Sequence, residues 1–265
     1  MTANDARNTT TGYGAPRRAL VTGASHGLGL DTARRLAADG WSVTGVGRRP
    51  ATAVEQPVPF DYQSANLSLP GTYPEVAGAA NGGWDLVVHS AVHYADFHHR
   101  PRLGFADTEE MLRVNALAPY YLTLEILDQQ PADRFCSVVV VNSEAMYHAD
   151  RHSAPYAASK AALRLLTAGL AESCRERQAA VSTLVLGPLD DERKRADLRA
   201  IAGKLGAREE EVTRKFLKRS NPDLVIEELI DYTSCFHSIR HLQNLGRRAN
   251  GMVCRLDGGS AGSLI

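Results

Sequence analysis

The stretch of sequence that decides the fold is Ala19–Gly29, which reads ALVTGASHGLG. A short apolar run leads into a turn containing Gly23, Gly27 and Gly29, and a segment with helical spacing follows. Glycines let a backbone turn tightly and approach a ligand, and the N-terminus of a helix offers unpaired N–H groups to phosphates. This order predicts a dinucleotide-binding loop, and a tight turn without a ligand is the weaker alternative.

Strands and helices alternate along the rest of the chain. Apolar runs predict strands at residues 19–21, 41–46, 58–60, 85–89, 136–141, 181–186 and 251–256. Segments with helical spacing predict helices at residues 30–39, 109–129 and 155–177. The alternation predicts a Rossmann-type α/β fold, a doubly wound parallel sheet of about seven strands with helices on both faces.

We expect a single domain over residues 18–265, preceded by a flexible polar tail at residues 1–17. One insertion stands out, at about residues 190–220, because it is polar and helical in character. A solvated pair of surface helices and a lid over a substrate site explain this insertion equally well.

Composition excludes several classes of protein. The 265 residues include 30 basic and 30 acidic side chains, so the formal net charge is zero, whereas a nucleic-acid-binding protein usually carries a basic excess. The four cysteines form no CxxC motif, which argues against disulfides and against a metal site. No apolar run approaches the ~18 residues of a membrane span, and the first residues lack a signal-peptide pattern. We therefore expect a cytoplasmic protein without nucleic-acid or membrane partners.

Two arginines, Arg48 and Arg49, follow the second predicted strand. A protein that binds a free ribose 2′-hydroxyl usually has a carboxylate here, about 20 residues after the glycines. Arginine instead pairs with phosphate through two hydrogen bonds, and a carboxylate would repel it. The pair predicts NADP(H) in preference to NAD(H), unless both side chains are merely exposed loop residues.

The candidate catalytic residues are Tyr156, Lys160 and Ser143. Tyr156 and Lys160 lie one helical turn apart, so they share a face of the predicted helix. A phenol has a pKa of about 10, and a neighbouring ammonium lowers that pKa, which makes tyrosine a usable general acid or base. Ser143 ends the preceding strand, at the edge where open α/β sheets bind ligands. Its hydroxyl can donate a hydrogen bond to a carbonyl oxygen.

In combination, these motifs resemble the short-chain dehydrogenase/reductase family over about residues 18–259. The family's TGxxxGxG turn matches Thr22–Gly29, and its Asn–Ser–Tyr–Lys tetrad falls on Asn115, Ser143, Tyr156 and Lys160. The resemblance implies that the tyrosine transfers the proton and the serine orients the substrate oxygen. It also implies that the lysine binds the nicotinamide ribose and lowers the tyrosine pKa, and that the asparagine anchors a water of the proton relay.

The same resemblance implies further contacts. Asp61, placed after the third predicted strand, corresponds to an aspartate that contacts adenine. The other implied cofactor contacts are Ser25, His26, Leu28, Tyr62, Ser90, Ala91, Gly187, Pro188 and Leu189, together with the glycines, arginines, Tyr156 and Lys160 named above. The substrate residues are expected to be Ser143, Tyr156, Tyr147 and His93.

Some residues depart from the family pattern or have two readings. The family's Asn-Asn-Ala-Gly segment is His89–Val92 here, so a valine replaces the glycine that admits the cofactor. Asp190 replaces a Thr or Ser that contacts the cofactor amide. Glu144 either reads substrate polarity or is simply solvent-exposed. His98 and His99 are interpreted as loop residues, because no ligand pattern accompanies them.

The expected activity is NADPH-dependent reduction of a small-molecule ketone or other carbonyl to an alcohol, or the reverse reaction. The segment Lys204–Asp231 resembles the lid of some oxoacyl-type reductases in the family, which favours an acyl-type or biosynthetic substrate. Two alternatives remain open: an NADP-binding sensor without turnover, and a family member that dehydrates, epimerises or reduces alkenes. The resemblance also implies a homodimer or homotetramer that pairs the helices at 109–129 and 155–177.

Overall fold

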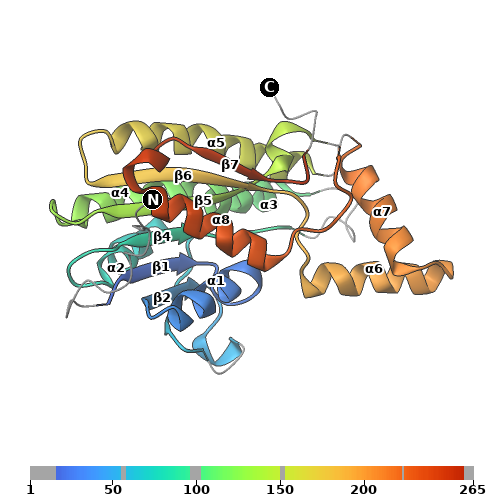
Figure 1. The fold of residues 1–265 in the computed structure, drawn as a ribbon, viewed down its shortest axis with the longest axis horizontal. Helices are drawn as coiled ribbons and strands as arrows, with labels where there is room; N and C mark the ends of the chain where they lie inside the picture. The colour runs from blue at the N-terminus through green and yellow to red at the C-terminus, as the bar shows by residue number, and fades with distance from the viewer. Residues whose placement is uncertain (1–15, 55–57, 96–102, 150–152, 223, 260–265) are drawn as a thin grey trace, which may run out of the picture.

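The computed structural model describes residues 16–54, 58–95, 103–149, 153–222 and 224–259. Seven parallel strands form one sheet in the order β3-β2-β1-β4-β5-β6-β7 (Figure 1). The strands are β1 Arg18–Thr22, β2 Ser42–Gly47, β3 Asp61–Ser64, β4 Leu86–His89, β5 Cys136–Ser143, β6 Ala179–Leu186 and β7 Val253–Leu256. The strand order reverses between β1 and β4, and ligands bind at such a switch point in open α/β sheets. The predicted fold class is confirmed.

Helices cover both faces of the sheet (Figure 1). One face packs against α1 Gly27–Ala38 and α8 Tyr232–Leu245. The other face packs against α2 Tyr73–Gly78, α4 Ala118–Gln129 and α5 Ala154–Ser173. The remaining helical segments are α3 Phe105–Leu112, a π turn at Arg113–Leu117, α6 Glu192–Leu205, α7 Glu209–Ser220, and the 3₁₀ turns Ala51–Ala53, Pro70–Thr72, Glu144–Tyr147 and Gly246–Ala249.

Burial on both faces explains the apolar strands. Every residue of β6 is buried, and in β1 the side chain of Leu20 joins one core while its neighbours Ala19 and Val21 join the other. A shift of register by one residue would exchange the two sets of side chains between the cores, so the pattern fixes how the strands pair.

The third strand was predicted at the wrong place. It is Asp61–Ser64, paired with Thr44–Gly47 of β2, and not residues 58–60. β3 is one of the two edge strands, and its sequence DYQS is polar, because an edge strand needs little apolar burial. Phe60 packs against the core from outside the strand. Asp61 therefore begins β3 instead of following it.

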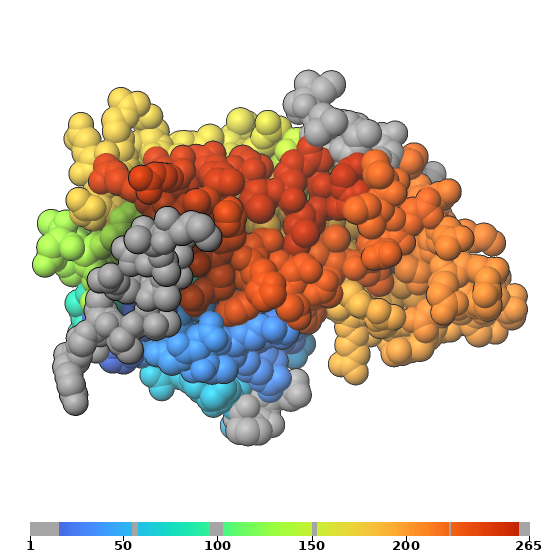
Figure 2. Space-filling model, in the orientation of Figure 1, coloured from blue at the N-terminus to red at the C-terminus, as the bar shows by residue number. Residues whose placement is uncertain are grey.

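The insertion forms a helical pair, as predicted. α6 and α7 pack against each other through Leu198, Ala202 and Val212. They lie beyond the carboxyl end of the sheet (Figure 1), and in the space-filling view they form the orange projection at one end of the molecule (Figure 2). We call α6 and α7 the lid helices. In the described part of the chain, no helix has both the length and the apolarity needed to cross a membrane.

Candidate active site

The glycines of the loop between β1 and α1 are required by close backbone contacts. Gly23 has a φ of +76°, and a Cβ there would lie 2.8 Å from Cα of Ala91. A Cβ on Gly29 would overlap the carbonyl oxygen of Gly23. Larger residues would therefore separate β1 from α1 or from the segment after β4, so the loop is a tight cradle.

The start of α1 can hold an anion. His26 precedes the helix and makes no side-chain hydrogen bond to its N–H groups, and Gly27 follows with a φ of +59°. Ser25 Oγ lies 3.1 Å from His26 Nδ1. Burial lowers the pKa of His26, and the charges of Arg49 and Arg193 lower it further against Asp191. His26 is therefore neutral at pH 7 and can contribute a ring N–H or lone pair.

The two arginines after β2 have different surroundings. Both are exposed, and Nη1 of Arg48 lies 4.0 Å from Oε1 of Glu110. The carbonyl of Arg49 accepts a 3.0 Å hydrogen bond from the Tyr62 hydroxyl, and Tyr62 also bonds the side chain of Ser25. The Arg49 backbone is thus linked through Tyr62 to Ser25 of the glycine-rich loop.

The segment after β4 is held against the end of β1. Thr22 Oγ1 accepts hydrogen bonds from the N–H groups of Ser90 and Ala91, each at 3.2 Å. Val92, the departure from the family pattern, has a half-exposed side chain. Ser90 and Ala91 therefore border the glycine-rich loop.

His89 occupies its unusual position as a buried neutral side chain. Its Nε2 lies 2.9 Å from Thr123 Oγ1, and Thr123 donates its own proton to the Pro119 carbonyl at 2.6 Å. His89 must therefore be the donor to Thr123. Burial lowers the pKa of His89 to about 3, so it remains uncharged. His89 is therefore a residue of the protein interior that joins β4 to α4.

Asn115 lies fully buried in the π turn between α3 and α4. Its Oδ1 accepts the His93 N–H at 2.7 Å, and its Nδ2 donates to the His93 carbonyl at 2.9 Å and to Ser159 Oγ at 3.0 Å. Ser159 in turn donates to the Tyr156 carbonyl at 2.7 Å. Asn115 thus joins the segment after β4 to the helix that carries Tyr156.

Ser143, Tyr156 and Lys160 come together at the carboxyl end of β5. The side chains of Ser143 and Tyr156 share a hydrogen bond, and Lys160 Nζ lies 5.9 Å from the centre of the Tyr156 ring. Lys160 is 4% exposed and donates a 3.2 Å hydrogen bond to the Val141 carbonyl. Asn142 Oδ1 accepts the Ser143 N–H at 2.8 Å and its Nδ2 donates to the Lys160 carbonyl at 3.2 Å. The sequence prediction did not include Asn142.

In the protein without ligand, the pKa values of Tyr156 and Lys160 are shifted by burial. Burial raises the pKa of Tyr156 to about 12, although the Ser143 hydrogen bond acts in the opposite direction. Burial lowers the pKa of Lys160 to about 8. In the protein alone the tyrosine pKa is therefore raised and not lowered as expected, because desolvation outweighs the Ser143 hydrogen bond.

The turn after β6 is fastened at both sides. A Cβ on Gly187 would lie 3.1 Å from Cα of Asp257, and the Pro188 carbonyl accepts the Ile230 N–H at 2.9 Å. Leu189 pairs with Ile230, and the Asp190 N–H donates to the Ile230 carbonyl at 2.8 Å. The Asp190 carboxylate forms an ion pair with Arg195 of α6.

Other candidate residues fall into three groups. Asp61 lies at the amino end of β3. Asn66, two residues beyond the carboxyl end of that strand, is partly buried, and its Oδ1 accepts a 3.2 Å hydrogen bond from the Ser68 N–H. Tyr147 has the guanidinium groups of Arg164 and Arg255 at 5.3 and 5.6 Å from its ring centre. His98 and His99 lie outside the described residues.

Two residues near Tyr156 and Ser143 were missed or misread. The Tyr94 ring packs edge-on against Tyr156, with centroids 4.9 Å apart, and is half-exposed. Glu144 is buried, so the expectation that it is solvent-exposed is wrong. Its partner is Asn221, which lies 77 positions away in the chain, so no local pattern links the two.

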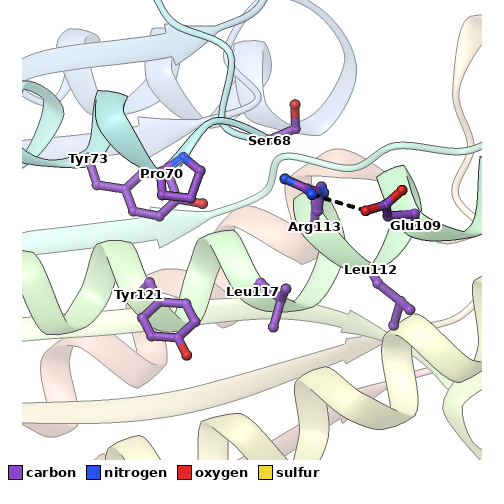
Figure 3. A pocket seen from close by; sticks show the side chains of 8 residues that line it. All are labelled: Ser68, Pro70, Tyr73, Glu109, Leu112, Arg113, Leu117 and Tyr121. Atoms are coloured by element: carbon purple, nitrogen blue, oxygen red, sulfur yellow. Dashed lines mark hydrogen bonds and ion pairs between the residues drawn. The ribbon is translucent and has the colours of Figure 1, made fainter. Parts of the chain in front are cut away.

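A separate pocket of about 330 Å³ lies between α3, α4 and the 3₁₀ turn at Pro70–Thr72 (Figure 3). Leu112, Leu117 and Tyr121 line it, and the Arg113–Glu109 ion pair of 3.0 Å crosses its edge. The catalytic candidates are not among its lining residues. Within the described ranges, no three His, Cys, Asp or Glu side chains gather as a metal site.

Comparison with known proteins defines the family. Residues 17–200 match the family described as short chain dehydrogenase, and the chain belongs to that family. L-xylo-3-hexulose reductase of Hypocrea jecorina is 32% identical over 200 residues, which cover 64% of this chain and 66% of the relative. Dehydrogenase/reductase SDR family member 4 of Sus scrofa is 32% identical over 181 residues, which cover 64% of each protein. The chain thus spans slightly less than two thirds of these relatives.

A solved structure shows the same fold. The crystal structure of BdcA in complex with NADPH superposes with a TM-score of 0.73 at 19% identity, and the match covers 92% of this chain and 94% of that one. At this level of identity the likeness extends to the architecture of the sheet and helices.

Proposed function

We propose that this protein is an NADP(H)-dependent oxidoreductase that reduces a carbonyl group of a small molecule to an alcohol. The observation that carries the proposal is the meeting of Ser143, Tyr156 and Lys160 at the carboxyl end of β5, on the same edge of the parallel sheet as the glycine-rich loop after β1. The family's reductases, among them the hexulose reductase, support the same chemistry.

The residues present fit a dinucleotide. Gly23 and Gly29 lie in a cradle that a Cβ would fill, and the uncapped start of α1 suits a pyrophosphate. Arg49, with Arg48 and His26, would hold a 2′-phosphate, and Leu28, Ser25 and Tyr62 complete this side. Ser90, Ala91 and the turn Gly187–Leu189 border the nicotinamide side. BdcA was solved with NADPH, which supports the choice of cofactor. We propose that Asn66, and not Asp61 as expected, contacts the adenine, because Asp61 lies at the amino end of β3.

The nicotinamide, when bound, supplies or accepts the hydride. Tyr156 then donates its phenolic proton to the oxygen of the reduced carbonyl, and Ser143 holds that oxygen by a hydrogen bond. Lys160 carries a positive charge at pH 7, since its pKa is about 8, and this charge favours the tyrosinate left after proton transfer. Asn115 keeps the segment at His93 and the start of α5 together, and so preserves the position of Tyr156.

The substrate would enter beside Tyr94 and His93, with Tyr147 farther along the turn after β5. Tyr94 presents an aromatic face next to Tyr156 and is half-exposed, which suits a carbonyl compound with an apolar side. The lid helices would close this side. A sensor that binds NADP without turnover remains the second candidate, motivated by Val92 at the position of a family glycine.

The test is consumption of NADPH with a panel of ketoses, aliphatic and aromatic ketones, and β-keto esters. We expect turnover by the wild type and a loss of about 10²- to 10⁴-fold in kcat for Tyr156→Phe, the range typical of a general acid. Turnover that survives Tyr156→Phe unchanged would refute this mechanism. Binding of NADPH without turnover of any panel member would instead favour the sensor. Mass analysis of products from deuterated NADPH separates carbonyl reduction from alkene reduction.

The protein is also proposed to form a homodimer or homotetramer through α4 and α5. Leu117 at the end of the π turn is 40% exposed, Tyr121 on α4 is 52% exposed, and Leu165 on α5 is 75% exposed. Large apolar side chains exposed on neighbouring helices are typical of surfaces that pair.

A further inference from the structure

Glu144 is a buried acid directly beside Ser143, and the proposed reaction does not use it. Its side chain is 5% exposed, at the start of the 3₁₀ turn Glu144–Tyr147. Asn221 Nδ2 donates a 2.6 Å hydrogen bond to Glu144 Oε2, and Asn221 is itself 3% exposed. A buried carboxyl group destabilises the fold unless it is hydrogen-bonded, so this contact joins two segments that would otherwise leave polar groups unsatisfied.

Asn221 follows directly after α7, and its backbone is held on both sides. Its N–H donates to the Leu217 carbonyl at 2.8 Å, and its carbonyl accepts the Leu224 N–H at 3.2 Å. Slightly farther along, the Ile226 N–H donates to the Gly258 carbonyl at 2.9 Å. The Asn221 side chain therefore extends from a fixed backbone at the end of the lid helices to the turn after β5.

That turn also carries the serine. Ser143 Oγ accepts the Ala145 N–H at 3.2 Å, which closes the turn around Glu144, and the same hydroxyl shares a hydrogen bond with Tyr156. A displacement of the Glu144 side chain would move a turn only a few atoms long. The orientation of the Ser143 hydroxyl therefore depends on where Glu144 is held.

The charges that act on Glu144 come from Arg255 in β7 and from Asp257 directly after that strand. Asp257 is 4% exposed and forms a 2.6 Å ion pair with Arg255. Burial raises the pKa of Glu144 to about 6; the Asn221 hydrogen bond opposes this rise, Asp257 adds to it, and Arg255 opposes it. Glu144 therefore changes its charge within the range in which an enzyme assay is run.

We propose that Glu144 and Asn221 are a positioning pair that fixes the lid helices to the turn carrying Ser143, so that lid position and serine orientation depend on each other. Its kinetic consequences rest on the proposed function, whereas the attachment of the lid does not. A hydrogen bond to a carboxylate is stronger than one to a neutral carboxyl group. The lid is accordingly held more firmly when Glu144 is ionised than when it is protonated.

The first experiment measures hydrogen–deuterium exchange of the α7 amides in the full-length protein without ligand. Asn221→Ala is expected to exchange these amides about 10-fold faster than the wild type. The matched control is Glu227→Gln, which removes the ion pairs of Glu227 with Lys218 at 3.1 Å and Arg214 at 3.3 Å. Arg214 and Lys218 are exposed residues of α7, so the control removes a lid contact that does not include Glu144 or Ser143 and is expected to keep wild-type kinetics in the assay below.

The pH dependence supplies a readout that a passive structural contact would not give. After correction for intrinsic exchange, α7 of the wild type is expected to exchange faster at pH 5 than at pH 7. Glu144→Gln keeps the shape and an acceptor oxygen but cannot ionise, so this difference should disappear. Because Glu144→Gln is nearly isosteric, it tests the proposal even where Asn221→Ala does not fold.

The second experiment is kinetic and uses the panel ketone that the wild type reduces fastest. Asn221→Ala is expected to lower kcat about 10-fold and to raise KM for the ketone, with KM for NADPH unchanged. Wild-type exchange and wild-type kinetics in Asn221→Ala, or a pH difference that persists in Glu144→Gln, would overturn the positioning pair. Absence of turnover in the wild type would refute the proposed function, and the exchange measurement would still decide the attachment of the lid.

Discussion

At the scale of single residues, burial sets the protonation of the site. Tyr156 and Lys160 are both withdrawn from water, so burial raises the pKa of the tyrosine to about 12 and lowers the pKa of the lysine to about 8. At pH 7 the tyrosine is therefore a neutral phenol and the lysine still carries most of its charge. A neutral phenol is the form that the proposed carbonyl reduction needs as its proton donor.

Lys160 should make the free energy of unfolding depend on pH. Its pKa in the folded protein, about 8, is below its ordinary value of 10.5, so burial of the charged form destabilises the fold. Between pH 8 and pH 10.5 the unfolded chain holds a proton that the folded protein has released, so the unfolding free energy rises with pH. Relative to Lys160→Met, the wild type should gain roughly 3 kcal/mol across this window. Urea unfolding of both proteins at several pH values measures the gain, and parallel curves would contradict it.

Arg49 should determine the preference for NADPH over NADH. Its link to Tyr62 places it beside the glycine-rich loop, whereas Arg48 faces Glu110. Loss of a charge-assisted hydrogen bond predicts that Arg49→Ala weakens NADPH binding about 10- to 100-fold with NADH binding nearly unchanged. Arg48→Ala, the matched comparison, should have a smaller effect. Titration of intrinsic fluorescence with each cofactor measures this, and equal losses for NADPH and NADH would exclude a phosphate contact.

At the scale of elements, the π turn at Arg113–Leu117 positions Asn115, which connects the segments around Tyr156. It directs Asn115 toward both the His93 backbone and Ser159, so a single amide connects the segment after β4 to α5. π turns inserted in α-helices are frequent at functional sites. The geometry of this turn, more than the length of the helix, places the asparagine.

Removal of the Asn115 amide should therefore lower the stability of the fold. Asn115→Ala leaves the His93 N–H and carbonyl without their partner and is expected to destabilise the fold by about 2–4 kcal/mol. The comparison is Gln63→Ala, which loses an exposed 2.9 Å hydrogen bond to Glu75 and should change the unfolding free energy by less than about 0.5 kcal/mol. Equal unfolding midpoints for the two variants in urea would show that Asn115 is not a structural link.

Elements and site residues differed in how far sequence could predict them. Interior strands such as β5 and β6 were predictable because burial on both faces demands an apolar run. β3 was misplaced because an edge strand can be polar, and α8 was omitted although its buried residues have helical spacing. Tyr156 and Lys160 could be paired from sequence because they lie one helical turn apart, whereas Asn115 was assigned only by the family resemblance. Tyr94 and Asn221 were not, because their contacts depend on how distant segments pack.

At the scale of the whole molecule, the balanced net charge conceals an uneven surface. Arg48 and Arg49 gather positive charge beside the loop, and the lid helices carry most of their charged residues on exposed faces. α4 and α5, in contrast, expose large apolar side chains. The described surface therefore divides into a charged end and an apolar side.

The apolar side predicts self-association. Replacement of Leu165, 75% exposed, and Tyr121, 52% exposed, by glutamate should convert an oligomer to a monomer, since charge at the centre of an apolar interface is strongly unfavourable. The control is Ile201→Glu on α6, where another apolar side chain is 44% exposed away from this side. Light scattering measures the mass, and a wild type that is already monomeric would refute the pairing of α4 and α5.

The segment between β6 and α8 that carries the lid helices begins and ends at one point of the fold. Leu189 and Asp190 at its start are bonded to Ile230 at its end, just before α8. Between these ends, Asn221 bonds Glu144 and Ile226 bonds Gly258. On the proposed function, the lid helices therefore form an exchangeable cassette: a replacement that keeps Asn221 and Ile226 would alter the proposed substrate side and leave β6, α8 and the turn carrying Ser143 in place.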